Sequence, residues 1–498
     1  MATTAAPLTE LSADSSPKTP FEPPALCIDL DGTLVKTDTL HECLILLLRR
    51  NVLYFLLLPW WLLKGKAYFK QEVCRRVQLT VSSLPYNQSL LAYLKGAQKD
   101  DRQVVLVTGA DRCIAEQVAV HLGVFESVIA SDGVTNLTGD RKRDTLIKRF
   151  GPGGFDYAGN GRADLPVWEH ANSAIIVNAN SRVATQAGAR TQVAAVFHDQ
   201  PHPLRSLAAT LRVHQWVKNV LLFVPLVTSH RLVELPLVLL TVCAFFAFSF
   251  CASSVYVLND LLDLHSDRLH EKKRRRPFAA GNLPLLTGLP LQVMLLATTV
   301  ALASALPSTF ALWLGAYYLI TLAYSTYFKR KLLLDVLVLA GLYTLRVIAG
   351  SAVIGVTCSP WLLAFSMFLF TSLAFVKRYA DLVRAGSTDM LQGSGRGYLV
   401  MDRSIVANLG TTCGFLCVVI LALYINSPQV ETLYKTPIIL WLLCPLLMYW
   451  ISRVWVIAAR ERMESDPVVF ALRDRISYGV GLCAALIIFS ASFPWTIF

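Results

Sequence analysis

Short β-branched apolar runs alternate with helix-like segments in the N-terminal part of the chain. The runs lie at residues 25–30, 104–108, 174–178 and 193–197. Apolar strands separated by helices are typical of a parallel sheet, so residues 25–197 predict a soluble α/β domain. Residues 1–24 are rich in Ala, Thr, Ser and Pro without an apolar core, and we expect a disordered leader there.

The pattern changes to long apolar runs after residues 198–210, a Pro- and His-containing segment that we expect to be a linker. Several of these runs approach the roughly 20 residues that a helix needs to cross a bilayer, and we expect an all-α bundle of nine membrane helices. The turns after the second, fourth, sixth and eighth runs carry most of the Arg and Lys, which predicts that these turns and the soluble domain are cytoplasmic. The expected helices lie near residues 217–232, 235–258, 288–306, 309–328, 333–356, 360–377, 404–426, 436–456 and 476–495.

One segment of the soluble domain is almost wholly apolar. Residues 52–63 read VLYFLLLPWWLL, and Arg49, Arg50, Lys64 and Lys66 flank them. Twelve residues are too short to span a bilayer, so two interpretations stay open. The segment is either an interfacial helix with aromatic and basic anchors or a helix buried in a cap.

Composition and charge narrow the class of protein. The chain has 498 residues, is 54% hydrophobic and has a formal net charge of +12. It is too apolar to be wholly soluble, and its basic excess suits anionic lipids and phosphorylated substrates. No basic and aromatic array favours nucleic acid, and the eleven cysteines lack metal-site spacing, so we expect reduced thiols.

A cluster of acidic residues ends the second long apolar run. Asp260, Asp263 and Asp267 are spaced i, i+3 and i+7, which on a helix would place three carboxylates on one face beside Asn259. Such oxygen ligands suit Mg²⁺ carrying a polyphosphate. The alternative is a solvated loop with a topology-setting basic cluster. The basic run that follows offers phosphate ligands at Arg274, Arg275 and Arg276.

The soluble domain carries a second set of polar residues, at the ends of its predicted strands. In an aspartyl-phosphate mechanism Asp29 would attack phosphorus and Asp31 would protonate the leaving oxygen. Thr108 and Lys142 would hold the phosphoryl oxygens. Mg²⁺ would lie between Asp29, the Asp31 carbonyl and Asp164, with Asn160 close by in the sequence.

These residues resemble the haloacid dehalogenase (HAD) superfamily, through a DxDGT motif at residues 29–33 and three later motifs in the family's order. The resemblance implies a Rossmann-like parallel sheet with a helical cap at about residues 40–100. One departure is Asn160, where the family usually has an aspartate. An amide oxygen ligates magnesium without bringing charge, so an active phosphatase and a retained non-catalytic fold both stay open.

The NDxxDxxxD stretch with its basic run resembles the UbiA superfamily of intramembrane prenyltransferases, over about residues 211–498. Enzymes of its aromatic branch carry a second aspartate motif, whose first position is Lys377 here. The entry segment 211–219 is instead similar to the decaprenyl-phosphate phosphoribosyltransferase branch, which includes rhizobial nodulation proteins of the NoeC type. The residues that carry this likeness and would bind substrate are Lys218, Lys329, Arg346, Lys377, Arg378 and Tyr379.

The resemblance implies transfer of 5-phosphoribose from phosphoribosyl diphosphate (PRPP) to a polyprenyl phosphate, on the route to an arabinosyl lipid donor of the cell envelope or of nodulation factors. Magnesium on the three aspartates would neutralise the departing diphosphate. Each single basic residue has a topology-setting role as its alternative. The fused soluble domain would then remove the 5-phosphate from the lipid product on the same face of a bacterial inner membrane.

Two other functions remain open at this level. One is an aromatic prenyltransferase that uses prenyl diphosphate. The other is a transporter or lipid-binding protein in which Arg346 and Arg453 mark a permeation path. Prenyl chain length, the downstream pathway and a homo-oligomeric state leave no trace in the sequence.

Overall fold

The computed structural model describes residues 23–384, 397–463, 466–471 and 473–494. The expected leader at residues 1–24 therefore lies outside the described residues, apart from Pro23 and Pro24. The chain forms two compact units. The N-terminal unit comprises residues 1–203 and 262–285, and the membrane unit comprises residues 204–261 and 286–498.

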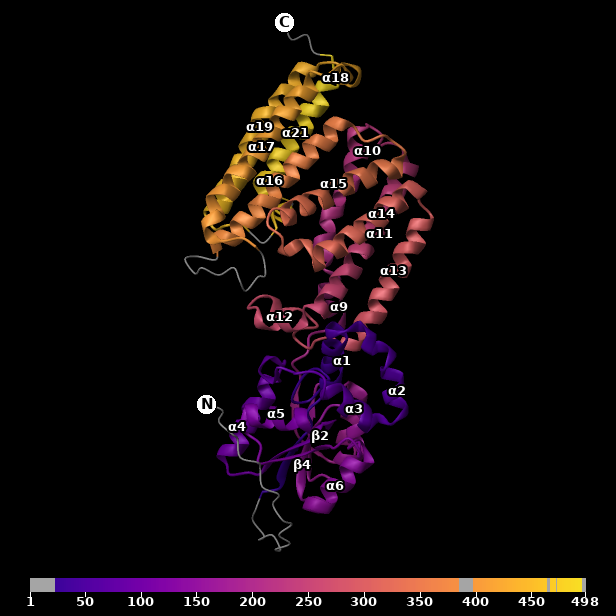
Figure 1. Ribbon diagram of the computed structural model, residues 1–498, viewed down its shortest axis with the longest axis vertical. Helices are drawn as coiled ribbons and strands as arrows, with labels where there is room; N and C mark the ends of the chain where they lie inside the picture. Colours follow the sequence, from indigo (N-terminus) through magenta and orange to yellow (C-terminus); the bar gives the residue numbers. More distant parts are fainter. Residues whose placement is uncertain (1–22, 385–396, 464–465, 472, 495–498) are drawn as a thin grey trace. The chain divides into compact units, whose positions relative to one another are not determined.

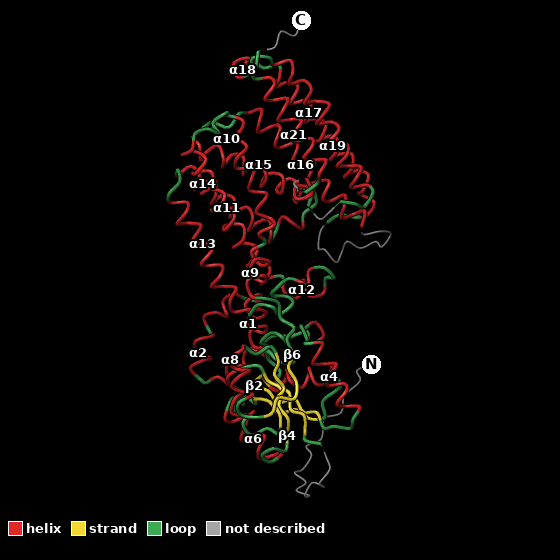
Figure 2. Tube along the Cα trace, turned by 180° about the vertical axis from the view of Figure 1, so that it is seen from behind, coloured by secondary structure: helices red, strands yellow, loops and turns green. Residues whose placement is uncertain are grey.

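A six-stranded, wholly parallel sheet forms the centre of the N-terminal unit, as predicted (Figure 2). Its order, β3-β2-β1-β4-β5-β6, reverses between β1 and β4, and ligands bind at such a switch point in open α/β sheets. Two strands, β3 and β4, are additional to the four apolar runs. The strands are β1 Ala25–Ile28, β2 Val104–Asp111, β3 Ser127–Ser131, β4 Phe155–Gly159, β5 Ser173–Val177 and β6 Gln192–Phe197.

Strand β1 shows why the central runs are continuously apolar. Leu26 and Ile28 belong to one buried cluster, whereas Ala25 and Cys27 belong to another. Successive side chains of a strand point to opposite faces, so both faces of this sheet are covered. The helices of this unit are α1 Thr39–Arg50, η1 Val52–Leu56, α2 Leu58–Leu63, α3 Lys66–Cys74, η2 Val81–Ser83, α4 Gln88–Lys99, α5 Arg112–Leu122, α6 Asp140–Phe150, η3 Arg162–Asp164, α7 Leu165–Trp168 and α8 Ser181–Gly188.

The segment 262–285, distant in sequence, packs into this unit. It contains α12 Leu264–Leu269 and η5 Lys273–Arg275. Arg268 of α12 binds the Glu42 carboxylate of α1 through both Nη atoms, and its Nε donates to the Ala279 carbonyl at 3.0 Å. Gly281 has a φ of +72°, and a Cβ there would lie 2.6 Å from the Lys36 Cβ. Residues 262–285 are therefore held by contacts within the N-terminal unit.

The membrane unit is helical, as predicted, but the count of nine membrane helices is not confirmed. Six helices within the described residues are long and apolar enough to cross a membrane. The expected first span is a 3₁₀-helix, η4 Val213–Phe223, followed by the short α10 Val224–Thr228. Helices α14 Ser308–Thr326 and α21 Arg475–Ala491 form where membrane spans were expected, but they are not among the six candidate spans. The six are 235–262, 285–304, 334–354, 360–384, 400–425 and 437–459.

The helices of this unit lie side by side (Figure 1), and their close packing depends on small residues. A Cβ on Gly350 would lie 2.2 Å from the Leu222 carbonyl oxygen, and one on Gly410 would lie 2.3 Å from the Trp455 ring. The remaining elements are α9 Pro203–Leu211, α11 Leu235–Leu262, η6 Leu285–Thr287, α13 Gly288–Ser304, η7 Phe328–Arg330, α15 Leu334–Ile354, α16 Pro360–Arg384, η9 Val400–Asp402, α17 Arg403–Ile425, α18 Pro428–Leu433, η10 Pro437–Leu442, α19 Leu443–Ala459 and α20 Pro467–Ala471.

Candidate functional sites

Two predicted carboxylates of the N-terminal unit face the ammonium group of a predicted lysine. Asp29 follows β1, Asp164 ends η3 after β4, and Lys142 comes from α6. The Lys142 Nζ lies 2.8 Å from Asp29 Oδ1 and 3.7 Å from Asp164 Oδ1, and all three residues are buried. The parallel pairing of β1 with β4 brings the two carboxylates to the same edge of the sheet.

Tyr157 of β4 completes this cluster, and sequence reasoning missed it. Its hydroxyl accepts a hydrogen bond from Lys142 Nζ at 2.8 Å and donates one to Asp164 Oδ1 at 2.8 Å. Burial and the nearby Asp164 charge raise the pKa of Tyr157, so the hydroxyl stays protonated. A tyrosine inside a strand gives no sequence signal, because aromatic residues are common there.

The two aspartates of the DxDGT motif have different environments. Burial raises the pKa of Asp29 to about 6, with Lys142 opposing the rise and Asp164 adding to it. Burial also raises the pKa of Asp31 to about 8, and the Asp38 charge adds to that rise. Near neutral pH Asp29 is therefore mostly ionised and Asp31 mostly protonated, which suits a nucleophile beside a general acid.

The turn after Asp31 requires a glycine. Gly32 has a φ of +74°, and a Cβ there would lie 2.0 Å from Asn160 Nδ2. The Asn160 side chain thus approaches the DxDGT turn, while its backbone N–H donates to Asp164 Oδ2 at 3.0 Å. This arrangement brings Asn160, the position at which the fourth motif differs from the usual HAD sequence, next to the first motif.

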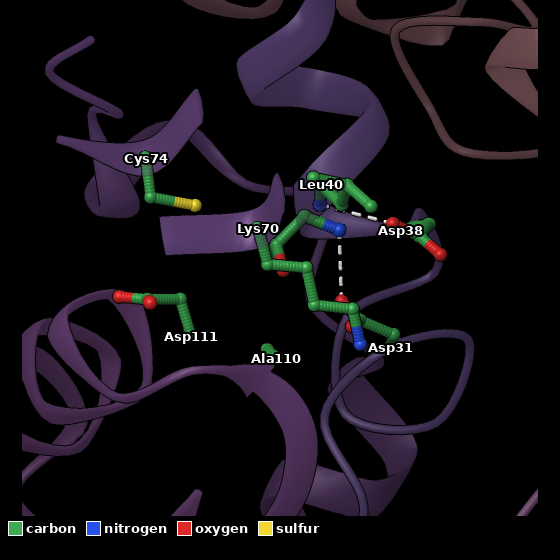
Figure 3. A pocket seen from close by; sticks show the side chains of 8 residues that line it. Asp31, Asp38, Leu40, Lys70, Cys74, Ala110 and Asp111 are labelled. Carbon is green, nitrogen blue, oxygen red and sulfur yellow. Dashed lines mark hydrogen bonds between the residues drawn. The ribbon is translucent and has the colours of Figure 1, made fainter. Parts of the chain in front are cut away.

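A pocket beside Asp31 contains residues that the sequence did not single out (Figure 3). Lys70 of α3 donates from Nζ to the Gly109 carbonyl at 2.6 Å and to Asn136 Oδ1 at 2.8 Å. Burial lowers the pKa of Lys70, against the nearby Asp31 and Asp38 charges. Predicted Thr108 is buried in β2, and its Oγ1 accepts the Ala110 N–H at 3.0 Å. The pocket is lined by Asp31, Asp38, Thr39, Leu40, Lys70, Cys74, Ala110 and Asp111.

The acidic motif after the second apolar run is not one continuous helix. Helix α11 ends at Leu262, Asp263 lies between the helices with φ −93° and ψ 10°, and Asp267 lies in α12. The expected single face with i, i+3 and i+7 spacing is therefore wrong, because the helix is interrupted at Asp263. In the membrane unit, Asp260 accepts a hydrogen bond from Arg212, and Asn259 Nδ2 donates to Ser325 Oγ at 2.9 Å.

Asp267 is buried in the N-terminal unit. Its Oδ2 accepts a hydrogen bond from Arg276 Nη1 at 2.5 Å, and its Oδ1 is buried without a hydrogen-bond donor among the described residues. Arg274 and Arg275 of the same basic run are exposed to solvent. Lys273 Nζ lies 3.9 Å from Oδ1, which is too far for a hydrogen bond. A buried carboxylate oxygen that accepts no hydrogen bond is costly, and a directly bound metal cation would satisfy it.

The residues present fit magnesium in both regions by their donor chemistry. No group of three or more His, Cys, Asp and Glu side chains within the described ranges is arranged to hold a metal ion alone. Magnesium commonly needs only one or two protein carboxylates and completes its shell with water and phosphate oxygens. Asp29 and Asp164 already face one cation, Lys142, and Asp267 offers an unsatisfied oxygen.

Two predicted lysines of the membrane unit meet at Asp466, a residue that sequence reasoning missed. Asp466 Oδ2 lies 2.5 Å from Lys218 Nζ and 3.4 Å from Lys377 Nζ, and the Tyr343 hydroxyl donates to Asp466 at 3.4 Å. Burial acts to raise the pKa of Asp466, but the charges of Lys377 and Lys218 outweigh it and hold that pKa well below its usual range. A lone aspartate far from every motif carries no local signal.

Other predicted basic residues of this unit have different partners. Arg346 donates from Nε to Asn219 Oδ1 at 2.9 Å, and its guanidinium lies 5.5 Å from the Tyr343 ring, next to the lysine pair. Arg378 is buried against Asp335, and Lys329 is half-buried in η7. Tyr379 packs edge-on against Trp455 and accepts hydrogen bonds from Arg403.

The two arginines that would mark a permeation path both form hydrogen bonds to other side chains of the protein. Arg453 forms two hydrogen bonds to the Asp474 carboxylate, at 2.7 and 3.0 Å. Arg346 is held by Asn219 and by the Tyr317 hydroxyl. Protein-held guanidinium groups do not favour the transporter interpretation.

Residues 220–476 match the UbiA prenyltransferase family. The chain is 37% identical over 465 residues to the protein y4nM of Sinorhizobium fredii, covering 93% of this chain and 90% of that protein. It is 36% identical to nodulation protein NoeC of Azorhizobium caulinodans, covering 55% of this chain and 88% of NoeC. It is 34% identical to decaprenyl-phosphate phosphoribosyltransferase of Mycobacterium tuberculosis over 212 residues, covering 42% of this chain and 70% of that enzyme.

Among solved structures, the chain is similar to a UbiA homolog from Archaeoglobus fulgidus bound to DMAPP and Mg²⁺. The TM-score is 0.43 and the identity 17%, covering 57% of this chain and 97% of that one.

Proposed function

Because the chain belongs to the UbiA prenyltransferase family and is an integral membrane protein, we propose that its membrane unit transfers 5-phosphoribose from PRPP to a polyprenyl phosphate. The observation that carries the proposal is the 34% identity to decaprenyl-phosphate phosphoribosyltransferase over 70% of that enzyme. The presence of Lys377 where aromatic prenyltransferases are expected to have an aspartate also supports it. The site faces the cytoplasm of a bacterial inner membrane.

In this reaction an ionised oxygen of the polyprenyl phosphate attacks C1 of the ribose, and the bond from C1 to the diphosphate breaks. The diphosphate leaves with the electron pair of that bond, so no general base is needed. Arg274, Arg275 and Arg276 bind phosphate oxygens of the donor, because guanidinium groups match phosphate geometry. Lys218 and Lys377, which Asp466 orients, bind the second anionic substrate.

Magnesium would be held by Asp260, Asp263 and Asp267, and when bound it would neutralise charge on the leaving diphosphate. The buried Asp267 Oδ1 supports this assignment, because it accepts no hydrogen bond among the described residues and faces only the more distant Lys273 Nζ, at 3.9 Å.

Donor choice tests the proposal. Purified protein in lipid vesicles is offered labelled PRPP with polyprenyl phosphate, or prenyl diphosphate with an aromatic acid, each with Mg²⁺ or EDTA. We expect a labelled ribosyl lipid only from PRPP with Mg²⁺, and loss of that product in the Asp263→Asn variant. A prenylated aromatic acid would establish the other branch of the family and refute the proposal.

We propose that the N-terminal unit is a HAD-like phosphatase that removes the 5-phosphate of this lipid. The observation that carries this proposal is the convergence of Asp29, Lys142 and Asp164 at the switch point of the sheet. Asp29 attacks the phosphorus, the bond from phosphorus to the ribose 5-oxygen breaks, and Asp31 donates a proton to that oxygen. Water then hydrolyses the aspartyl phosphate, and Asp31 takes up its proton. Lys142 and Thr108 hold the phosphoryl oxygens, and Asp29, the Asp31 carbonyl, Asn160 and Asp164 would hold magnesium.

The product of the coupled assay tests this second activity. We expect the unaltered protein to yield the dephosphorylated ribosyl lipid and the Asp29→Asn variant to stop at the phosphorylated one. If both proteins stop at the phosphorylated lipid, the phosphatase proposal fails while the transferase proposal stands.

A further inference from the structure

Residues 52–63, which form η1 and α2, expose a contiguous set of apolar side chains; we call this segment the apolar hairpin (α2 in Figure 1). Single exposed apolar residues are normal on a protein surface, whereas a contiguous group of this kind marks an interaction site. The exposed side chains are Val52, Leu53, Phe55, Leu56, Leu57, Trp60, Leu62 and Leu63, with exposed fractions between 44% and 82%.

The apolar hairpin is fixed to the N-terminal unit by its other face. Trp61 is buried at 5% exposure, its ring centroid lies 6.2 Å from that of Tyr54, and the Arg76 guanidinium lies 4.6 Å above it. Tyr54 and Leu58 pack against the apolar cluster on one side of the sheet. The expectation of a helix buried in a cap therefore holds for this inner face alone. The outer face is presented to the surroundings by a segment that is itself ordered.

The charges around the apolar hairpin have one sign. Arg49 and Arg50 precede it, Lys64 and Lys66 follow it, and all four are exposed. Residues 49–66 contain no Asp or Glu. Basic residues that border an apolar, Trp-containing surface complement an anionic lipid surface, in which the apolar groups enter the headgroup boundary and the cations meet phosphate.

We propose that the apolar hairpin docks on the surface of an anionic lipid bilayer and attaches the N-terminal unit to the membrane that the other unit spans. Twelve residues cannot cross a bilayer, so the contact is interfacial. Membrane lipid is present wherever this chain is folded, because six of its helices are long and apolar enough to span. The inference does not depend on either proposed enzymatic activity.

A polarity-sensitive fluorophore on a single introduced cysteine tests the proposal in the full-length protein. The exposed Cys113 and Cys483 are first replaced by serine. Leu56→Cys carries the probe, and Val120→Cys in α5 is the matched control, since Leu56 is 72% and Val120 is 73% exposed. The proteins are reconstituted in phosphatidylglycerol vesicles with or without lipids brominated on the acyl chain.

We expect a blue-shifted Leu56 probe whose emission falls at least two-fold with brominated lipid, and a Val120 probe that reports water in both vesicles. The blue shift of the Leu56 probe should be larger in phosphatidylglycerol vesicles than in neutral phosphatidylcholine vesicles. Replacing Arg49, Arg50, Lys64 and Lys66 by glutamine should abolish this difference. A Leu56 probe that reports water in anionic vesicles overturns the proposal. A probe that is shielded but insensitive to brominated lipid also overturns it, because a protein surface would then cover the hairpin.

Discussion

The buried ion pair between Glu42 and Arg268 gives the sharpest test of how the chain is assembled. Side-chain exposure is 3% for Glu42 and 6% for Arg268, and both guanidinium Nη atoms donate to the carboxylate. Glu42→Gln removes the negative charge but keeps the size of the side chain. Arg268 cannot neutralise itself by losing a proton, so it stays charged and buried.

Removing one partner of a buried pair costs about 3–5 kcal/mol. The glutamine carbonyl still accepts one hydrogen bond, so we expect the lower end, about 3 kcal/mol, for the opening of residues 262–285. Since 1.4 kcal/mol corresponds to a factor of ten, opening should become about 100-fold more frequent. The amide hydrogens of α12 should then exchange about 100-fold faster in the full-length protein.

Hydrogen exchange of peptides from residues 262–285, read by mass spectrometry, checks this expectation. Asp140→Asn is the control, because its pair with Arg143 lies at the surface, where an ion pair contributes little to stability. The double variant Glu42→Arg with Arg268→Glu should recover part of the protection. If Glu42→Gln exchanges like the control, the pair does not hold the segment and the reasoning is refuted.

The same variant reports on the transferase, because Asp263 and Asp267 lie in the segment that Glu42 holds. If they bind magnesium as proposed, ribosyl-lipid synthesis should fall when the amide hydrogens of residues 262–285 lose their protection from exchange. A loosened segment with unchanged synthesis would refute the assignment of Asp267.

Three further outcomes are expected. Phosphatase kcat/KM should be highest between about pH 6 and 8, because Asp29 becomes protonated below this window and Asp31 loses its proton above it. A kcat/KM that does not change with pH would contradict the roles of Asp29 as nucleophile and Asp31 as general acid. Gly32→Ala should cost more than about 1 kcal/mol in thermal unfolding of the N-terminal unit, since φ is +74° there, and a stability equal to wild type would show that the turn tolerates a side chain. Asp466→Asn should destabilise the membrane unit by about 3–5 kcal/mol, because it leaves two lysine charges without their buried carboxylate, and an unchanged melting temperature in detergent would exclude this role.

Local patterns predicted the four strands whose sequences are continuous apolar runs, including β6, which is largely exposed, and they missed β3 and β4, although every residue of β4 is buried. Strand β4 contains Asp156, whose carboxylate is satisfied by Arg102, Asn172 and Ser173. A charged residue in a short strand weakens the apolar pattern, and its three partners come from elsewhere in the chain. Strand β3 is half-buried along most of its length and bounded by serines, so its apolar core is too short to stand out.

The sequence by itself determined the membrane character, the parallel sheet and the residue types of the two acidic motifs, because each depends on local composition or on fixed spacing. Tertiary structure decided which side chains meet. It interrupted the helix at Asp263, joined Lys218 to Asp466 across 248 positions, and joined Glu42 to Arg268 across 226. Such pairs follow from how helices and strands pack, and no periodicity in the chain specifies a contact between residues so far apart.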